Sequence, residues 1–143
     1  MAFTTTQLTG LTSDALSVLS TAQFGVLTST QLRGLTTTQL PGLTSTQVGS
    51  FTTLQVGGLT STQVRAFGTD QLLGFTTTDL LVLTTTQLIG LTSAQLSAFT
   101  TVQVGGLTSV GLGSLSTSQI RSINTGPRPT NLRPSHRRSP APS

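Results

Sequence analysis

Few side chains in this sequence could perform acid–base or nucleophilic chemistry. The only histidine, His136, lies in a stretch rich in proline and arginine, whereas a catalytic histidine needs a partner that positions it. The aspartates Asp14, Asp70 and Asp79 are far apart in the sequence, so neither a carboxylate pair nor a metal cage is expected. No base is available to activate the abundant serine and threonine hydroxyls. We therefore expect no enzyme activity, no cofactor and no metal site.

Four arginines near the end of the chain are the candidate contacts to nucleic acid: Arg128, Arg133, Arg137 and Arg138. Guanidinium groups bind phosphate, but no aromatic residues lie between these arginines to stack on bases. The same stretch holds five of the six prolines and no acidic residue. We expect residues 123–143 to form a disordered, basic, Pro-rich tail, and nucleic-acid binding through it is an alternative function.

The composition excludes several classes of protein. The sequence contains no cysteine, tryptophan, tyrosine, lysine or glutamate, and charged residues make up 7% of it. Without cysteine there can be no disulfide and no thiolate metal site. No run of about 20 apolar residues is present, so we expect no membrane-spanning helix. A cleavable secretory signal is not visible at the start of the chain.

Residues 3–122 divide into fifteen octapeptide repeats, here called octads, without an insertion. We label their positions a to h; the fifth octad, residues 35–42, reads LTTTQLPG. Position a is always Leu or Phe, f is always Leu, Val, Ile or Phe, and c is always Thr or Ser. Position b is Thr in twelve octads and position e is Gln in twelve. Because apolar replaces only apolar at a and f, we expect these positions to be buried and the variable d and g to be exposed.

Neither a long helix nor a long strand fits this spacing. Eight residues advance a continuous helix by about 80° beyond two full turns, so a and f would spiral around it. In a continuous strand, a and f would point to opposite faces. Each octad must therefore contain a bend, and we expect glycine at g or h to supply it.

One short helical turn per octad explains most of the pattern. Thr at b and Gln at e have the spacing of a capping box, which makes b the N-cap. Positions a and f are then the two ends of a hydrophobic staple. Gly at h falls where a left-handed residue often ends a helix. Asp14 and Asp70, at position d, would lie in the first turn, where the helix dipole favours an anion. This predicts a repeat solenoid of short capped helical turns over residues 3–122.

A β-solenoid with two octads per rung is the alternative fold. Thr and Val favour strands, and Gln at e could stack into ladders as in cross-β structures. Pro41 fits poorly in a central strand. In either fold one octad cannot be stable alone, because burying two apolar side chains gives about 3–6 kcal/mol and ordering eight residues costs about 12 kcal/mol. Octads 2, 10 and 14, which lack Gln at e, and octad 9, which lacks the hydroxyl at b, are the expected weak points.

Unbroken copies of LTTTQLxG over residues 3–122 resemble the octad arrays of large, repetitive bacterial exoproteins and surface proteins. The resemblance implies a role outside the cell or on its surface in adhesion, spacing or filament building. This chain is smaller, shows no export signal and ends in a basic stretch, so we expect either a fragment of a larger array or a stand-alone relative.

The first functional hypothesis is a structural or adhesive scaffold that self-assembles end to end into filaments. Its expected partners are further copies of the chain and a glycan or other surface ligand, with no small-molecule substrate. Binding to ice or another crystal surface is an alternative, and it requires a flat β face carrying a grid of threonine hydroxyls. The composition is also typical of O-glycosylated proteins.

Overall fold

A computed structural model describes residues 3–124, in which nearly every octad forms one short α-helix that begins at position c. No strand occurs in this range. The helical expectation is therefore supported, and the β-solenoid alternative is not. The helices are α1 (Thr5–Thr9), α2 (Ser13–Ser17), α3 (Thr21–Gly25), α4 (Ser29–Arg33), α5 (Ser45–Gly49), α6 (Thr53–Gly58), α7 (Ser61–Ala66), α8 (Thr69–Leu72), α9 (Thr77–Leu81), α10 (Thr85–Gly90), α11 (Ser93–Ala98), α12 (Thr101–Gly105), α13 (Ser109–Ser114) and α14 (Thr117–Asn124).

The hydroxyl at position b starts the helices, as the sequence predicts, except at α8, whose N-cap is Gly68. In α4 the Thr28 Oγ1 accepts a hydrogen bond from the Gln31 N–H at 3.2 Å, and the Gln31 Oε1 accepts one from the Thr28 N–H at 2.7 Å. The N-cap has extended backbone angles, φ −75° and ψ 158°. Both bonds satisfy N–H groups that the first helical turn leaves without a partner. Asp14 and Asp70 lie in the first turns of α2 and α8.

The helix ends differ from the expectation that Gly at h adopts a left-handed conformation. No glycine in the described range has a positive φ. Gly10 ends α1 in the right-handed region at φ −82°, while α6 runs through Gly58 and is followed by an extended Leu59 at ψ 146°. The prediction of a left-handed glycine was wrong, because the bend lies in the extended backbone of positions a and b.

In octads 5, 9, 11 and 13, close packing between turns leaves no room for a side chain at h. A Cβ placed on Gly42 would lie 2.5 Å from the Ser13 backbone O, and one on Gly74 would lie 2.2 Å from the Ser45 backbone O. Gly90 and Gly106 approach position c of the octad three before in the same way, at 3.1 Å from the Ser61 O and 2.8 Å from the Thr77 O. The missing side chain thus lets successive turns of the array touch at the backbone.

Octad 5 is the exception to the α-helical pattern. Its position g is Pro41, and here a short 3₁₀ helix, η1 (Leu40–Gly42), replaces the α-helix. Proline has no N–H to donate to the carbonyl one helical turn earlier. The capping contact of this octad survives, because the Thr36 N–H still donates to the Gln39 Oε1 at 2.9 Å.

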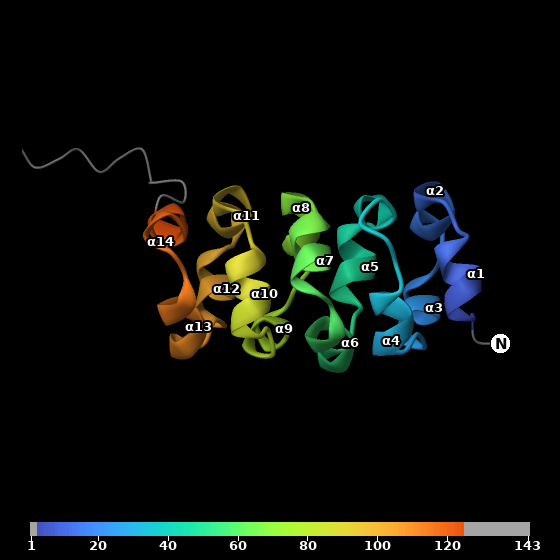
Figure 1. Cartoon of the computed structure of the whole chain (residues 1–143), viewed down its shortest axis with the longest axis horizontal. Coiled ribbons are helices and arrows are strands. Elements are labelled where there is room, and N and C mark those ends of the chain that lie inside the picture. Colours follow the sequence, from blue (N-terminus) through green and yellow to red (C-terminus); the bar gives the residue numbers. More distant parts are fainter. Residues whose placement is uncertain (1–2, 125–143) are drawn as a thin grey trace, which may run out of the picture.

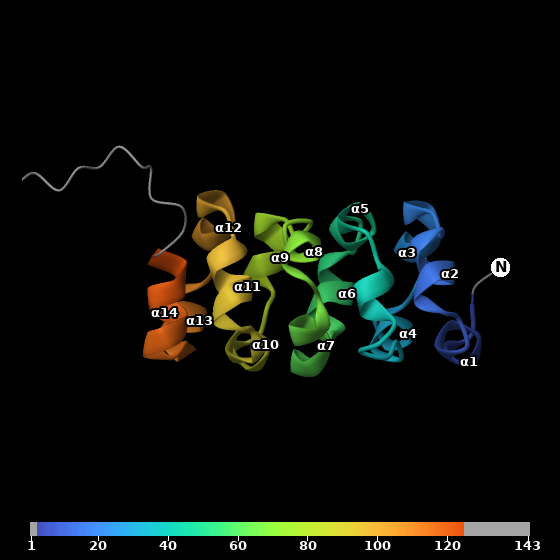
Figure 2. The ribbon, with the colours of Figure 1, turned by 90° about the horizontal axis from the view of Figure 1, so that it is seen from above.

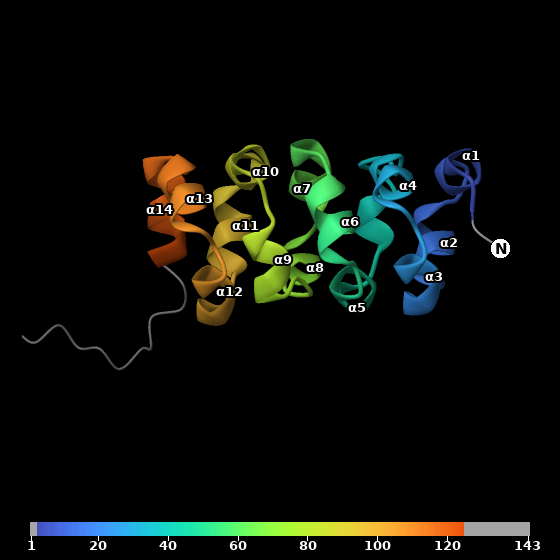
Figure 3. The ribbon, with the colours of Figure 1, turned by 90° about the horizontal axis from the view of Figure 1, so that it is seen from below.

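The octads wind into a superhelix, in which each helix packs against the helix three octads later. The pairs α4 and α6, α7 and α10, and α11 and α14 make the most extensive contacts of this kind. In Figure 1, α2, α8, α11 and α14 follow one another along the upper edge, and α4, α6 and α13 lie along the lower edge. Figures 2 and 3 show the same succession of turns from above and below. The same contact between helices three octads apart therefore recurs along the whole superhelix.

The core of the superhelix consists of positions a and f, as expected. Position f is buried in every octad from Leu8 to Leu96, and position a is buried from Leu27 to Leu115. Phenylalanines from different octads meet in this core, with Phe24 and Phe51 at a centroid distance of 5.9 Å and Phe67 and Phe75 also at 5.9 Å. Position d is exposed in all fifteen octads. One continuous hydrophobic column therefore runs through the array.

Candidate functional site

The residues that the sequence marks for chemistry do not form a cluster in the described part of the chain. Asp14, Asp70 and Asp79 lie on α2, α8 and α9 respectively. Residues 3–124 contain no group of three or more His, Asp or Glu side chains that could hold a metal ion. Within the same residues, no helix has the length and apolar character needed to cross a membrane.

The candidate contacts to nucleic acid all follow Asn124 in the sequence. Arg128, Arg133, Arg137 and Arg138, together with His136, lie outside the described residues. Binding of nucleic acid through these arginines, and disorder of the tail, therefore stay predictions. The described helix α14 ends at Asn124 and so includes the first two residues of the expected tail.

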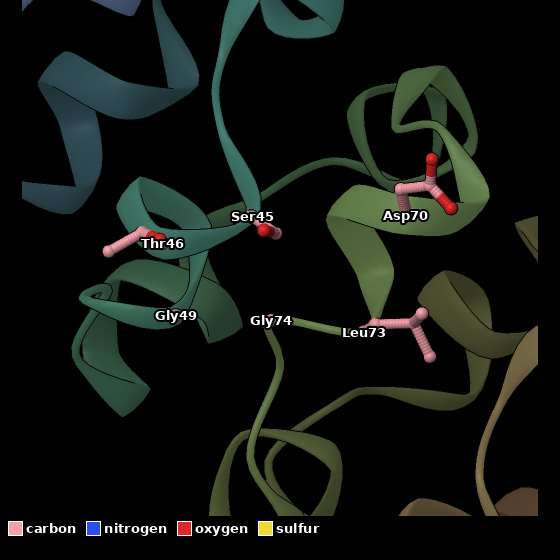
Figure 4. A pocket seen from close by; sticks show the side chains of 6 residues that line it. All are labelled: Ser45, Thr46, Gly49, Asp70, Leu73 and Gly74. Atoms are coloured by element: carbon pink, nitrogen blue, oxygen red, sulfur yellow. The ribbon is translucent and has the colours of Figure 1, made fainter.

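A depression of about 530 Å³ lies between α5 and α8. It is lined by Ser45, Thr46, Gly49, Asp70, Leu73 and Gly74. Figure 4 shows that the Thr46 and Leu73 side chains point away from each other and that Gly74 lies between them. A single carboxylate without a second charged or titratable group offers no acid–base pair, so this depression has no evident chemistry.

The most specialised polar feature of the described chain is the row of glutamines at position e, which we call the glutamine ladder. It comprises Gln31, Gln39, Gln47, Gln55, Gln63, Gln71, Gln87, Gln95, Gln103 and Gln119. The Oε1 atom of each accepts a hydrogen bond from the N-cap N–H of its own octad, as in the 3.0 Å bond from Thr60 to Gln63. This half of the amide starts the helix.

The Nε2 atom of each ladder glutamine binds the preceding turn of the superhelix. The Gln63 amide donates to the Leu32 and Arg33 carbonyls, both at 3.0 Å, and to the Leu35 carbonyl at 2.8 Å. Leu32 and Arg33 form the end of the helix four octads earlier, and Leu35 starts the octad after it. One side chain thus caps the beginning of its own helix and the end of another.

Burial makes these bonds important. Eight ladder glutamines, from Gln39 to Gln103, are between 2% and 7% exposed. An amide buried without partners costs about 1–3 kcal/mol, and no buried side-chain N or O in the described range lacks a partner. The ladder therefore fixes the register of turn on turn, because a shift by less than a whole octad would move the buried amides away from these carbonyls.

The ladder has two interior gaps. At octad 10, Asp79 keeps the capping contact and accepts a hydrogen bond from the Thr76 N–H at 2.9 Å. A glutamine at this position would also donate to the Phe51 carbonyl, and no described donor reaches that carbonyl. At octad 14, Gly111 carries no side chain, so the Leu83 carbonyl also lacks a glutamine donor. Octad 2 differs, because no turn precedes Ala15 in the described chain.

Sequence reasoning found the capping role of glutamine and missed its contact between turns. A capping box accepts Glu as well as Gln, yet the array uses Gln twelve times and Glu never. Glutamate has no N–H to donate, whereas Gln is both donor and acceptor. This strict choice of Gln was the available signal that both ends of the amide are bound.

Residues 22–53 and 73–109 match the family model for the ALTTAQ repeat. The matched stretches hold α4 to α5 and α9 to α12, so the ALTTAQ repeat includes the helix-capping Thr and Gln positions described above. No match was found among curated proteins or among solved structures. The comparison supports an array of repeats, and it names no activity.

Proposed function

We propose that this chain is an architectural scaffold that works outside the cell or on its surface, as a spacer or an adhesive element, and that it carries out no catalysis. The observation that carries the proposal is the glutamine ladder. Its bonds join turn to turn along the array, with Gln39 reaching Leu11 near one end and Gln119 reaching Leu91 near the other. Polar chemistry is thus used to hold the array together, which is what a spacer requires.

The surface of the array fits the same role. Position d is exposed throughout and carries Thr in seven octads. Exposed apolar side chains also occur, with Leu54 at 81% and Val110 at 71% exposure. Such a surface offers hydroxyls and methyl groups at regular intervals to a glycan or another surface ligand. The ice-binding alternative lacks its structural basis, because the flat β face that it requires does not form in residues 3–124.

The proposal can be tested by locating the chain on producing cells. An antibody raised against octads 6–9 should label intact cells, and protease added outside should remove the signal without lysis. An internal protein of the same cells serves as the control and should stay protected. Labelling that appears only after lysis would refute the proposed location.

Adhesion needs a separate measurement. Beads coated with the purified chain should attach to the producing cells or to their extracellular matrix more than beads coated with albumin. Replacing exposed Thr at position d by Asp in octads 4–6 (Thr30, Thr38 and Thr46) should reduce attachment while the fold is kept, because these side chains face solvent. Unchanged attachment would leave spacing as the function and remove adhesion through this surface.

A further inference from the structure

The two ends of the superhelix leave different apolar positions uncovered. At the N-terminal end, position a is only half-buried in octads 1–3, at Phe3, Leu11 and Leu19, although it is buried in every later octad. At the C-terminal end, position f is only half-buried in octads 13–15: Val104, Leu112 and Ile120. Position a is therefore covered by the preceding turn and position f by the following turn. The N-terminal end therefore lacks a preceding turn to cover position a, and the C-terminal end lacks a following turn to cover position f.

Hydrogen bonding shows the same complementarity. The Gln7 and Gln23 side chains make only their capping contacts, to Thr4 and Ser20, so their Nε2 atoms have no acceptor among the described residues. At the opposite end, no described donor reaches the carbonyls at position a of octads 13–15, which are Phe99, Leu107 and Leu115. In the interior of the array, the glutamine Nε2 atom donates to the carbonyl at position a, as from Gln63 to Leu35.

We propose that copies of this 143-residue chain stack head to tail, with the first turn of one copy continuing the superhelix of the next through the glutamine ladder. The proposal rests on the scaffold function and names its partner as a second copy of the chain. The occupant follows from the structure, because the surfaces brought together are the pair that meets at every interior turn. A head-to-tail contact of this kind does not close, so it builds filaments.

The apolar part of this contact is formed by a few residues. Phe3, Leu11 and Leu19 of one copy would cover the half-buried Val104, Leu112 and Ile120 of the other, and Ile123 at the end of α14 adds to this surface. The N-terminal helix α1 and the C-terminal helix α14 lie at opposite ends of the long axis, as Figure 2 shows. Addition of copies would therefore extend the array along that axis.

The decisive variant is Gln7→Glu with Gln23→Glu. Glutamate keeps the oxygen that caps the helix, and neither glutamine donates to another described residue, so the fold of one copy is expected to stay intact. Between copies the change removes donors and places carboxylates against carbonyl oxygens. The dissociation constant should rise by about tenfold or more, because two hydrogen bonds are lost and each contributes a factor of about 2 to 10.

The matched control is Thr6→Glu with Ala22→Glu, which adds the same charges to the same helices at the exposed position d. Sedimentation velocity and electron microscopy of the full chain over a concentration series should show filaments for the parent and the control, and weaker assembly for the Gln7→Glu, Gln23→Glu variant. Circular dichroism checks that all three chains are folded.

A parent that stays monomeric at every concentration would overturn the proposal, and so would equal assembly or equal loss of assembly in the two variants. Stacking without surface labelling on cells would refute the proposed location alone.

Discussion

Glutamine at position e owes its role to having a donor and an acceptor on one short side chain. In the interior octads the acceptor starts one helix and the donor caps another that is 28 to 31 residues away in the sequence. Local and long-range structure are therefore coupled through a single residue type. Replacing that residue tests the two functions separately.

Gln63→Glu should keep the capping contact and lose the contact between turns. Gln63 is 3% exposed and donates to three carbonyls, so the variant places a carboxylate beside carbonyl oxygens in the core. We expect a loss of about 2–4 kcal/mol in the free energy of unfolding, measured by urea denaturation. Gln23→Glu, which has no partner turn to lose, serves as the control and should change stability by less than about 0.5 kcal/mol. Equal effects would contradict the ladder.

Asp79→Gln should stabilise the fold, whereas Gln63→Glu should destabilise it. Asp79 is 3% exposed and binds only Thr76, while the Phe51 carbonyl lacks the donor that the ladder supplies elsewhere. A glutamine would complete the row and should raise the free energy of unfolding by about 1–2 kcal/mol. Gly111→Gln is a less favourable repair, because its Cβ would lie 2.4 Å from the Leu88 Cδ1. A loss of stability in Asp79→Gln would mean that the carboxylate has another role.

At the scale of the helix, the glycines fall into two kinds, open ones such as Gly25 at position g and tightly packed ones such as Gly74 at position h. Gly25 lies in α3 with nothing within 4 Å of an added Cβ, whereas an added Cβ on Gly74 would meet the Ser45 backbone O at 2.2 Å. Neither has a positive φ. The two glycines therefore differ in the space around them and not in the sign of φ.

Gly25→Ala and Gly74→Ala should change stability in opposite directions. Alanine at Gly25 reduces the entropy of the unfolded chain and should stabilise by about 0.5–1 kcal/mol. Alanine at Gly74 must push two turns apart and should destabilise by about 1–3 kcal/mol. Thermal unfolding followed by circular dichroism at 222 nm would check both. A stabilising Gly74→Ala would show that the turns are not in contact there.

The helix and its caps could be predicted because they depend on neighbours in the sequence. Thr at b, Gln at e and apolar a and f lie within one octad, and the capping box and the core positions were found from them alone. The number of octads per superhelical turn, and with it the second partner of glutamine, depends on packing between residues such as Ser13 and Gly42, which are 29 apart. No local pattern contains that distance, and this is why the role of Gly at h was predicted wrongly.

At the scale of the whole molecule, stability is expected to vary along the array. Beyond its neighbours in the sequence, each octad packs mainly against the octads one turn away, so the chain should behave as a row of coupled units whose ends open first. Core positions are half-buried at both ends and fully buried in between. The repeated backbone bond from position a to position f of the preceding octad, such as Leu59 N–H to the Val56 O at 3.2 Å, provides an equivalent reporter in each unit.

Hydrogen exchange of these position-a amides should give a profile that is highest in octads 6–9 and falls toward both ends. A dip is expected around octad 10, where Asp79 interrupts the ladder, and Asp79→Gln should remove it. Raising the protein concentration should increase protection in octads 1–3 and 13–15 together, because stacked copies would cover both ends at once. A profile that is flat along the array would mean that the octads open as one cooperative unit, and protection rising at one end alone would mean that the two ends do not bind each other.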